Sequence, residues 1–198
     1  MYDELILLSA ILFPVLMGTI LLLLKGMENP RHIYAYSGIS LVITGIMSVL
    51  LLFLPEKEFM LFELMENIPI LFKLDSVGKF FMVLVCISWI LAGFYSFSYM
   101  EHEKNKRRYF GFYLIVFGVL IGLGCSGTLI TMYAFYEFMT LASFPLVVHN
   151  QSREAVMASL KYLFYSFFGA YMALFGVFFL CKYTTGLTFT AGGTLNQT

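Results

Sequence analysis

The chain has 198 residues, of which 60% are hydrophobic and only 12% are charged, and its mean hydropathy is +0.86. Soluble domains carry about 25% charged residues, so this composition excludes an ordinary soluble protein and indicates one embedded in a membrane. The formal net charge is zero, which leaves no overall attraction to nucleic acid.

Apolar segments long enough to cross a bilayer follow one another along the chain, a helical crossing taking roughly 20 residues. They span residues 5–24, 33–54, 77–97, 109–127, 129–148 and 155–181. The sequence therefore predicts an all-α integral membrane protein with about six transmembrane helices in a single membrane domain over residues 1–198. The start, MYDE, lacks the positive region of a cleavable signal peptide, so the first segment is expected to remain as a helix.

The distribution of Lys and Arg predicts the orientation of these helices, because cytoplasmic loops carry an excess of positive charge. With the N-terminus outside, the cytoplasmic loops hold Lys25, Arg31, Lys104, Lys106, Arg107, Arg108 and Arg153, and the outer side holds Lys57, Lys73, Lys79 and Lys182. This excess favours an N-terminus outside. Its main source, the run EHEKNKRRYF, is interpreted as a cytoplasmic anchor at the lipid headgroups in preference to a specific anion site.

The connection at residues 55–76, which contains PEKEFMLFELMENIPILFKLDS, is long and mildly acidic. We expect it on the outer surface as short extended or hairpin structure, with Asp75 capping the third helix. In the fourth segment, Gly118 and Gly122 lie four residues apart, a spacing that favours close helix packing.

The tail TTGLTFTAGGTLNQT is polar, and in a helical membrane protein such a stretch usually leads to a further span. The chain is therefore expected to be part of a larger helical arrangement. The cysteines Cys86, Cys125 and Cys181 have no CxxC spacing and are interpreted as small apolar side chains, with neither a metal nor a cofactor expected in this chain.

Two ionisable side chains fall well inside predicted spans, Glu137 in the fifth and Lys161 in the sixth. A charge at the centre of a bilayer costs roughly 2.5–3.5 kcal/mol on insertion scales, so some compensating interaction is expected. The short turn HNQSRE makes these two helices antiparallel neighbours, and at about 1.5 Å per residue the side chains lie ~16 Å and ~10 Å from that turn. The sequence therefore permits an ion pair buried between them.

Hydroxyl-bearing side chains accompany both charges at helical spacing. Tyr133 and Thr140 share a face with Glu137, and Tyr165 follows Lys161 by one turn. They are candidates for a hydrogen-bonded water chain, with ordinary packing as the alternative. The protonation of a buried acid depends on whether its partner stays close, so the pair suits proton transfer. The competing hypothesis is a static structural ion pair.

Three blocks of the sequence resemble one family in order and spacing. They are LDSVGKFFMVLVCISWILAGFYSFSYM, RRYFGFYLIVFGVLIGLGCSGTLITMYAFYEFMTLASFPLVVH and AVMASLKYLFYSFFGAYMALFG. The family comprises the antiporter-like membrane subunits shared by respiratory complex I, Mrp cation/proton antiporters and membrane-bound hydrogenases. The variant YEFMTLASFPLV is most similar to the Mrp D-subunit and hydrogenase branches, and the resemblance covers the N-terminal portion of the family's fold.

In that family the acid of the fifth helix pairs with a lysine and controls the access of protons. Glu137 occupies this position, and Lys161 matches the lysine that opens the sixth helix. A better-known lysine, in the family's seventh helix, is expected outside this sequence, on another chain or segment that supplies the missing helices.

The resemblance implies a proton or sodium/proton translocating subunit of a multisubunit respiratory or energy-converting complex. Its place would be the inner (plasma) membrane of a prokaryote, and any redox centre would belong to partner subunits. The alternatives are a membrane scaffold or assembly subunit locked by Glu137 and Lys161, and a membrane enzyme that uses Lys161 as a Schiff-base nucleophile.

Overall fold

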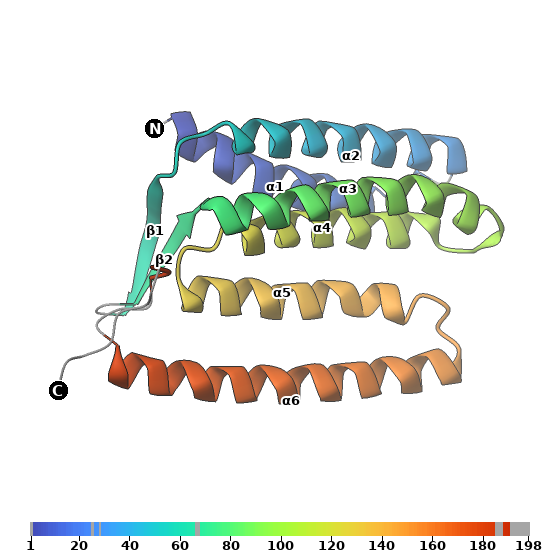
Figure 1. Cartoon of the computed structure of the whole chain (residues 1–198). Coiled ribbons are helices and arrows are strands. Elements are labelled where there is room, and N and C mark those ends of the chain that lie inside the picture. Colours follow the sequence, from blue (N-terminus) through green and yellow to red (C-terminus); the bar gives the residue numbers. More distant parts are fainter. Residues whose placement is uncertain (1, 25, 28, 66–67, 185–187, 191–198) are drawn as a thin grey trace.

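The computed structural model describes residues 2–24, 26–27, 29–65, 68–184 and 188–190, and within them six long apolar helices run side by side (Figure 1). These are α1 (Tyr2–Leu23), α2 (Pro30–Leu52), α3 (Ser76–Tyr99), α4 (Lys106–Gly124), α5 (Leu129–Val147) and α6 (Arg153–Tyr183). Each has 19 to 31 residues and is long enough to span a bilayer. The predicted all-α membrane architecture is confirmed.

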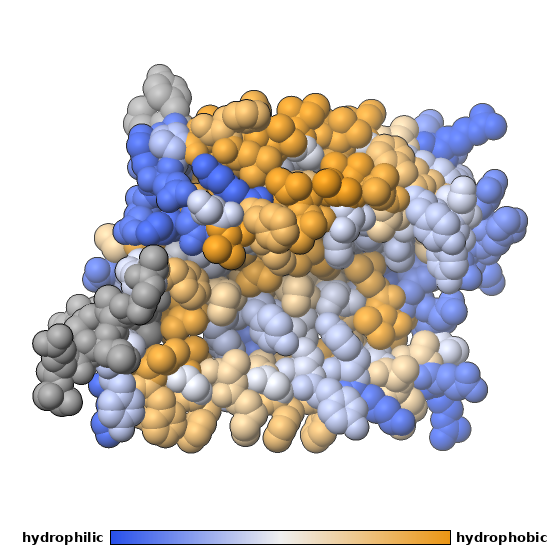
Figure 2. Space-filling model, in the orientation of Figure 1, coloured by the Kyte–Doolittle hydropathy of each residue, from blue (hydrophilic) through white to orange (hydrophobic). Residues whose placement is uncertain are grey.

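The two ends of the bundle differ in chemistry. At one, which we call the hairpin end, α1 begins and the strands β1 (Glu58–Met65) and β2 (Ile68–Lys73) pair in antiparallel fashion. At the other, which we call the basic end, α1, α3 and α5 finish, and α4 begins with residues 106–108, Lys-Arg-Arg. Figure 2 shows hydrophobic side chains over the middle of the bundle and hydrophilic ones toward both ends, as expected for helices that cross a membrane.

Helix α4 is the centre of the bundle. In its most apolar window 67% of the residues are buried, against 11% for α5 and α6. Glycines allow α1 to approach closely: a Cβ on Gly118 would lie 2.6 Å from the carbonyl oxygen of Ile11, and one on Gly18 would meet the backbone of Gly111. The close packing predicted from the glycine spacing in this helix is confirmed.

Three successive basic side chains at the start of α4 bind the backbone ends of three other helices. A helix leaves its last carbonyl groups without intrahelical partners, and cations near that end also interact favourably with the helix dipole. Lys106 Nζ donates to the oxygen of Glu101 just beyond α3 (2.7 Å), Arg107 to that of Leu24 beyond α1 (2.7 Å), and Arg108 to those of Val148 (3.3 Å) and His149 (2.9 Å) beyond α5. These contacts tie α1, α3 and α5 to α4.

The β-hairpin closes the opposite end, where the sequence predicted extended or hairpin structure. Strand β2 continues its pairing onto the α4–α5 connection: Lys73 N donates to Cys125 O, and Gly127 N donates to Leu71 O, both at 2.8 Å. Because this connection is extended, α4 ends at Gly124, three residues before the predicted end. Asp75 caps α3 as predicted, accepting a hydrogen bond from Gly78 N at 2.7 Å.

The close approach of α1 and α4 makes a testable prediction about stability. Gly118→Val should lower the free energy of unfolding by about 1–3 kcal/mol, because the added methyl groups meet the backbone of α1, which cannot move aside as a flexible side chain would. The matched control is Gly169→Val, since nothing lies within 4 Å of a Cβ at Gly169. Thermal unfolding in detergent, followed by circular dichroism, should separate the two variants; equal midpoints would contradict the packing described.

Candidate functional site

Glu137 lies in the middle of α5, about 12 Å from the start of that helix, and is partly buried. In the described part of the chain its one interaction partner is the phenol of Tyr133, one turn earlier. The predicted sharing of a helix face by these two residues is therefore observed. None of the described residues places a cation beside the carboxyl group, although its helix is apolar enough to span the bilayer.

The structure does not form the ion pair that the sequence permitted. Lys161 is exposed and makes no ion pair with any described residue. The side of α6 that packs on α5 carries Tyr162 and Ser166, and Lys161 lies roughly 100° and 140° around the helix from them. Depth along the helices was compatible with a pair, but the rotation of α6 directs Lys161, together with exposed Tyr165, away from α5.

Two separate pairs of hydroxyl groups join α5 to α6 on the basic-end side of Glu137. Thr140 Oγ1 lies 3.1 Å from Ser166 Oγ, and Ser143 Oγ lies 2.8 Å from Tyr162 Oη. Thr140 is only 1% exposed. We call these four residues the hydroxyl seam. It begins one turn after Glu137 and continues for one further turn toward the basic end.

Hydroxyl groups suit the relay of protons because each can donate one hydrogen bond and accept others, and its hydrogen can rotate. Both Thr140 and Ser143 also donate to backbone carbonyls of α5, at 3.2 Å and 3.1 Å. Sequence reasoning identified Thr140 but missed Ser143, Tyr162 and Ser166. The available signal was their spacing of three on α5 and four on α6, which aligns each pair on one helix face.

His149, just beyond the end of α5, is a further titratable group that sequence reasoning missed. Burial and the nearby Arg108 guanidinium lower the pKa of its imidazole below the usual 6.5. Its Nδ1 atom is buried without a hydrogen-bond partner, and its ring packs edge-on against Tyr109. His149 follows Ser143 by six residues and lies just past the end of α5, so a group that can exchange protons lies beyond the seam.

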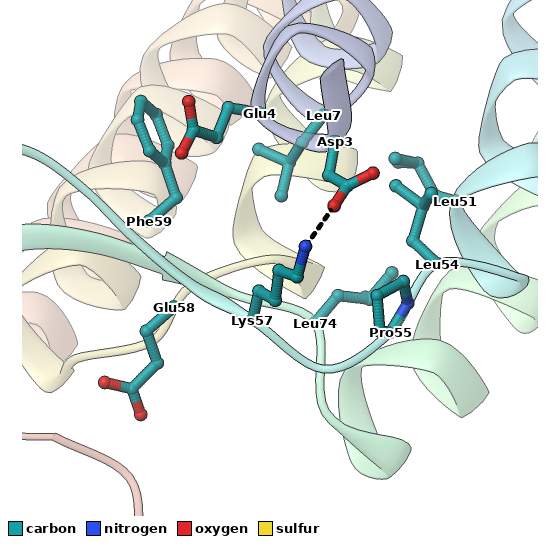
Figure 3. A pocket seen from close by; sticks show the side chains of 10 residues that line it. All are labelled: Asp3, Glu4, Leu7, Leu51, Leu54, Pro55, Lys57, Glu58, Phe59 and Leu74. Atoms are coloured by element: carbon teal, nitrogen blue, oxygen red, sulfur yellow. Dashed lines mark hydrogen bonds and ion pairs between the residues drawn. The ribbon is translucent and has the colours of Figure 1, made fainter. Parts of the chain in front are cut away.

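A small cavity at the hairpin end, of about 80 Å³, is a structural feature rather than a candidate site (Figure 3). Asp3 at the start of α1 pairs there with Lys57 at 2.7 Å, which raises the pKa of that lysine, and Glu58 pairs outside it with Lys73 at 2.8 Å. The first pair joins α1 to the residue that precedes β1, and the second joins β1 to β2. The described residues contain no cluster of three or more His, Cys, Asp and Glu side chains that could hold a metal ion.

Comparison with known proteins agrees with this architecture. Residues 64–110 match the family described as NADH-ubiquinone oxidoreductase (complex I), chain 5 N-terminus, and residues 126–197 match NADH:quinone oxidoreductase/Mrp antiporter, TM. The putative antiporter subunit mnhD2 of Staphylococcus aureus, from strains JH9 and Newman alike, is 27% identical over 194 residues, which are 96% of this chain and 37% of the relative.

A solved structure shares the fold. In the membrane-bound sulfane sulfur reductase, described as an archaeal respiratory membrane complex, one chain superposes with a TM-score of 0.74 at 17% identity, covering 92% of this chain and 38% of that one. The chain thus spans somewhat more than a third of the proteins it matches. It belongs to the antiporter-like membrane subunits shared by complex I and Mrp antiporters, and corresponds to their N-terminal portion.

Proposed function

We propose that the chain forms part of a proton or sodium/proton translocating subunit of a multisubunit complex in the plasma membrane of a prokaryote, with Glu137 as its buried proton station. The observation that carries the proposal is a mid-span carboxyl group that has no cation partner among the described residues, next to the hydroxyl seam. The name of the staphylococcal relative, an antiporter subunit, supports the same class of activity.

The energetics of burial favour a group that changes state. An ionised carboxylate at mid-bilayer costs several kcal/mol unless it is paired or hydrated. With Tyr133 as its one partner among the described residues, Glu137 must take up a proton, bind water, or meet a cation from another helix. Transport requires Glu137 to alternate between its protonated state and its charged, compensated states. In this proposal the hydroxyl seam leads the proton from Glu137 toward the basic end.

In this proposal Lys161 is not the ion-pair partner of Glu137 that the sequence permitted. Because it lies on the exposed side of α6 with Tyr165, its partner in proton transfer would come from helices outside this chain. The relatives, of which this chain covers 37%, contain sequence that could supply such helices. The alternative of a scaffold locked by a Glu137–Lys161 ion pair gains no support, since the described residues show no ion pair between these two side chains.

The first test replaces the proposed station. Glu137→Gln keeps the shape of the side chain, so the complex should assemble normally, but ion transport should be abolished because the amide cannot exchange the proton. Glu154→Gln, the same change at the start of α6, should leave transport intact. Transport would be measured in inverted vesicles with a pH-sensitive dye, and normal ion movement in the assembled Glu137→Gln complex would refute the proposal.

The second test addresses the hydroxyl seam. Tyr162→Phe removes only the oxygen that lies 2.8 Å from Ser143, and Tyr165→Phe makes the same change on the exposed side of α6. The first variant should slow dye-monitored transport severalfold because the relay is interrupted, whereas the second should slow it less. If both variants transported at the rate of the unmodified complex, protons would not use the seam.

The third test concerns orientation. We propose that the basic end is cytoplasmic and the hairpin end lies outside, following the distribution of positive charge. In a background in which exposed Cys181 is replaced by Ser, Met60→Cys in β1 should react with an impermeant maleimide in whole cells, and Lys104→Cys should react only after lysis. The reverse labelling pattern would show that the helices run in the opposite sense.

A further inference from the structure

A partly open cavity of about 380 Å³ lies at the basic end, between the start of α2 and the start of α4. Its size falls within the roughly 300–1,000 Å³ typical of pockets that hold small ligands. The lining residues are Met27, Pro30, Ile33, Glu103, Asn105, Lys106, Arg107 and Arg108.

The polar part of this lining is strongly positive. Three of its side chains are cationic, at residues 106–108, and one, Glu103, is acidic. In the part of the chain that the structure describes, none of the three cations forms an ion pair; their hydrogen-bond partners there are neutral backbone carbonyls. Among the described residues, the buried Nε atom of Arg108 in addition has no hydrogen-bond partner.

The backbone adds to this positive potential. Helix α4 starts at the cavity without an acidic residue in its first turn, and Asn105 at its N-cap adopts a φ of 58° and makes no side-chain capping bond. The positive end of the helix dipole therefore coincides with the three cations. Such an arrangement is unfavourable without a counter-charge, and guanidinium and ammonium groups together match the oxygen atoms of a phosphate.

The remaining wall of the cavity is apolar and is formed by Met27, Pro30 and Ile33 around the start of α2. A soluble anion gains nothing from such a wall, whereas the glycerol and upper acyl region of a lipid does. The cavity also lies at the level where the membrane-spanning helices end, which is the depth of lipid headgroups.

We propose that this cavity binds the phosphate headgroup of an anionic phospholipid, such as phosphatidylglycerol. The inference is independent of the role of Glu137. It replaces the diffuse headgroup anchor expected from the sequence with a defined site, in which the basic residues of α4 hold the phosphate while also binding the ends of α1, α3 and α5. A lipid in this position would add to the contact between α2 and α4.

The test uses the purified full chain in detergent and native mass spectrometry to measure bound lipid. Phosphatidylglycerol should bind more tightly than phosphatidylcholine. Arg107→Gln should weaken its binding by about fivefold, the effect of one charge at a membrane surface, and Glu103→Gln should strengthen it by a similar factor. The matched control Lys104→Gln, a neighbouring basic residue outside the lining, should have little effect.

Several outcomes would overturn the proposal. Equal weakening by Arg107→Gln and Lys104→Gln would indicate diffuse surface charge, and equal binding of both lipids would exclude charge recognition. Displacement of the lipid by inorganic phosphate at comparable concentration would identify a site for a soluble anion instead. Because Arg107 also binds the end of α1, circular dichroism is used to check that this variant folds. If it does not, Glu103→Gln decides, and a failure of that variant to strengthen lipid binding would refute the site.

Discussion

The arrangement of the other helices depends on how α4 is bound at its start. A helix leaves its last carbonyl groups without intrahelical partners, and the ends of α1, α3 and α5 lie together at the basic end. Residues 106–108 of α4 donate to all three ends, and the glycines along α4 let α1 pack closely enough to be reached. The first turn of α4 thereby contacts the ends of three other helices.

The contacts at the start of α4 also help to position the helix that carries the candidate site. Helix α5 is held at the basic end by Arg108 and at the hairpin end by Thr131, whose hydroxyl accepts a hydrogen bond from the backbone of β2 at 3.0 Å. Glu137 therefore sits on a helix fixed at both ends. Helix α6, by contrast, is joined to α5 by the two hydrogen bonds of the hydroxyl seam, and only 11% of its most apolar window is buried.

Much of this fold could be predicted from the sequence, because the length and apolar character of the helices, the cap at Asp75 and the face shared by Glu137 and Tyr133 are local properties. The rotation of α6 is not local: depth along the helix placed Lys161 near Glu137, but packing turned it away. The binding of helix ends by residues 106–108 was also inaccessible, since the acceptors are backbone carbonyls, which carry no sequence signature.

The central claim is that Glu137 exchanges a proton inside the membrane. The most direct measurement is infrared difference spectroscopy of the whole complex in membranes between two pH values, for the unmodified protein and for Glu137→Gln. The account predicts a protonated-carboxyl band that is absent in Glu137→Gln and that shifts when Thr140→Val alters the hydroxyl seam beside it. Identical difference spectra from the unmodified and Glu137→Gln complexes would show that this carboxyl group does not change its protonation, and would contradict the account.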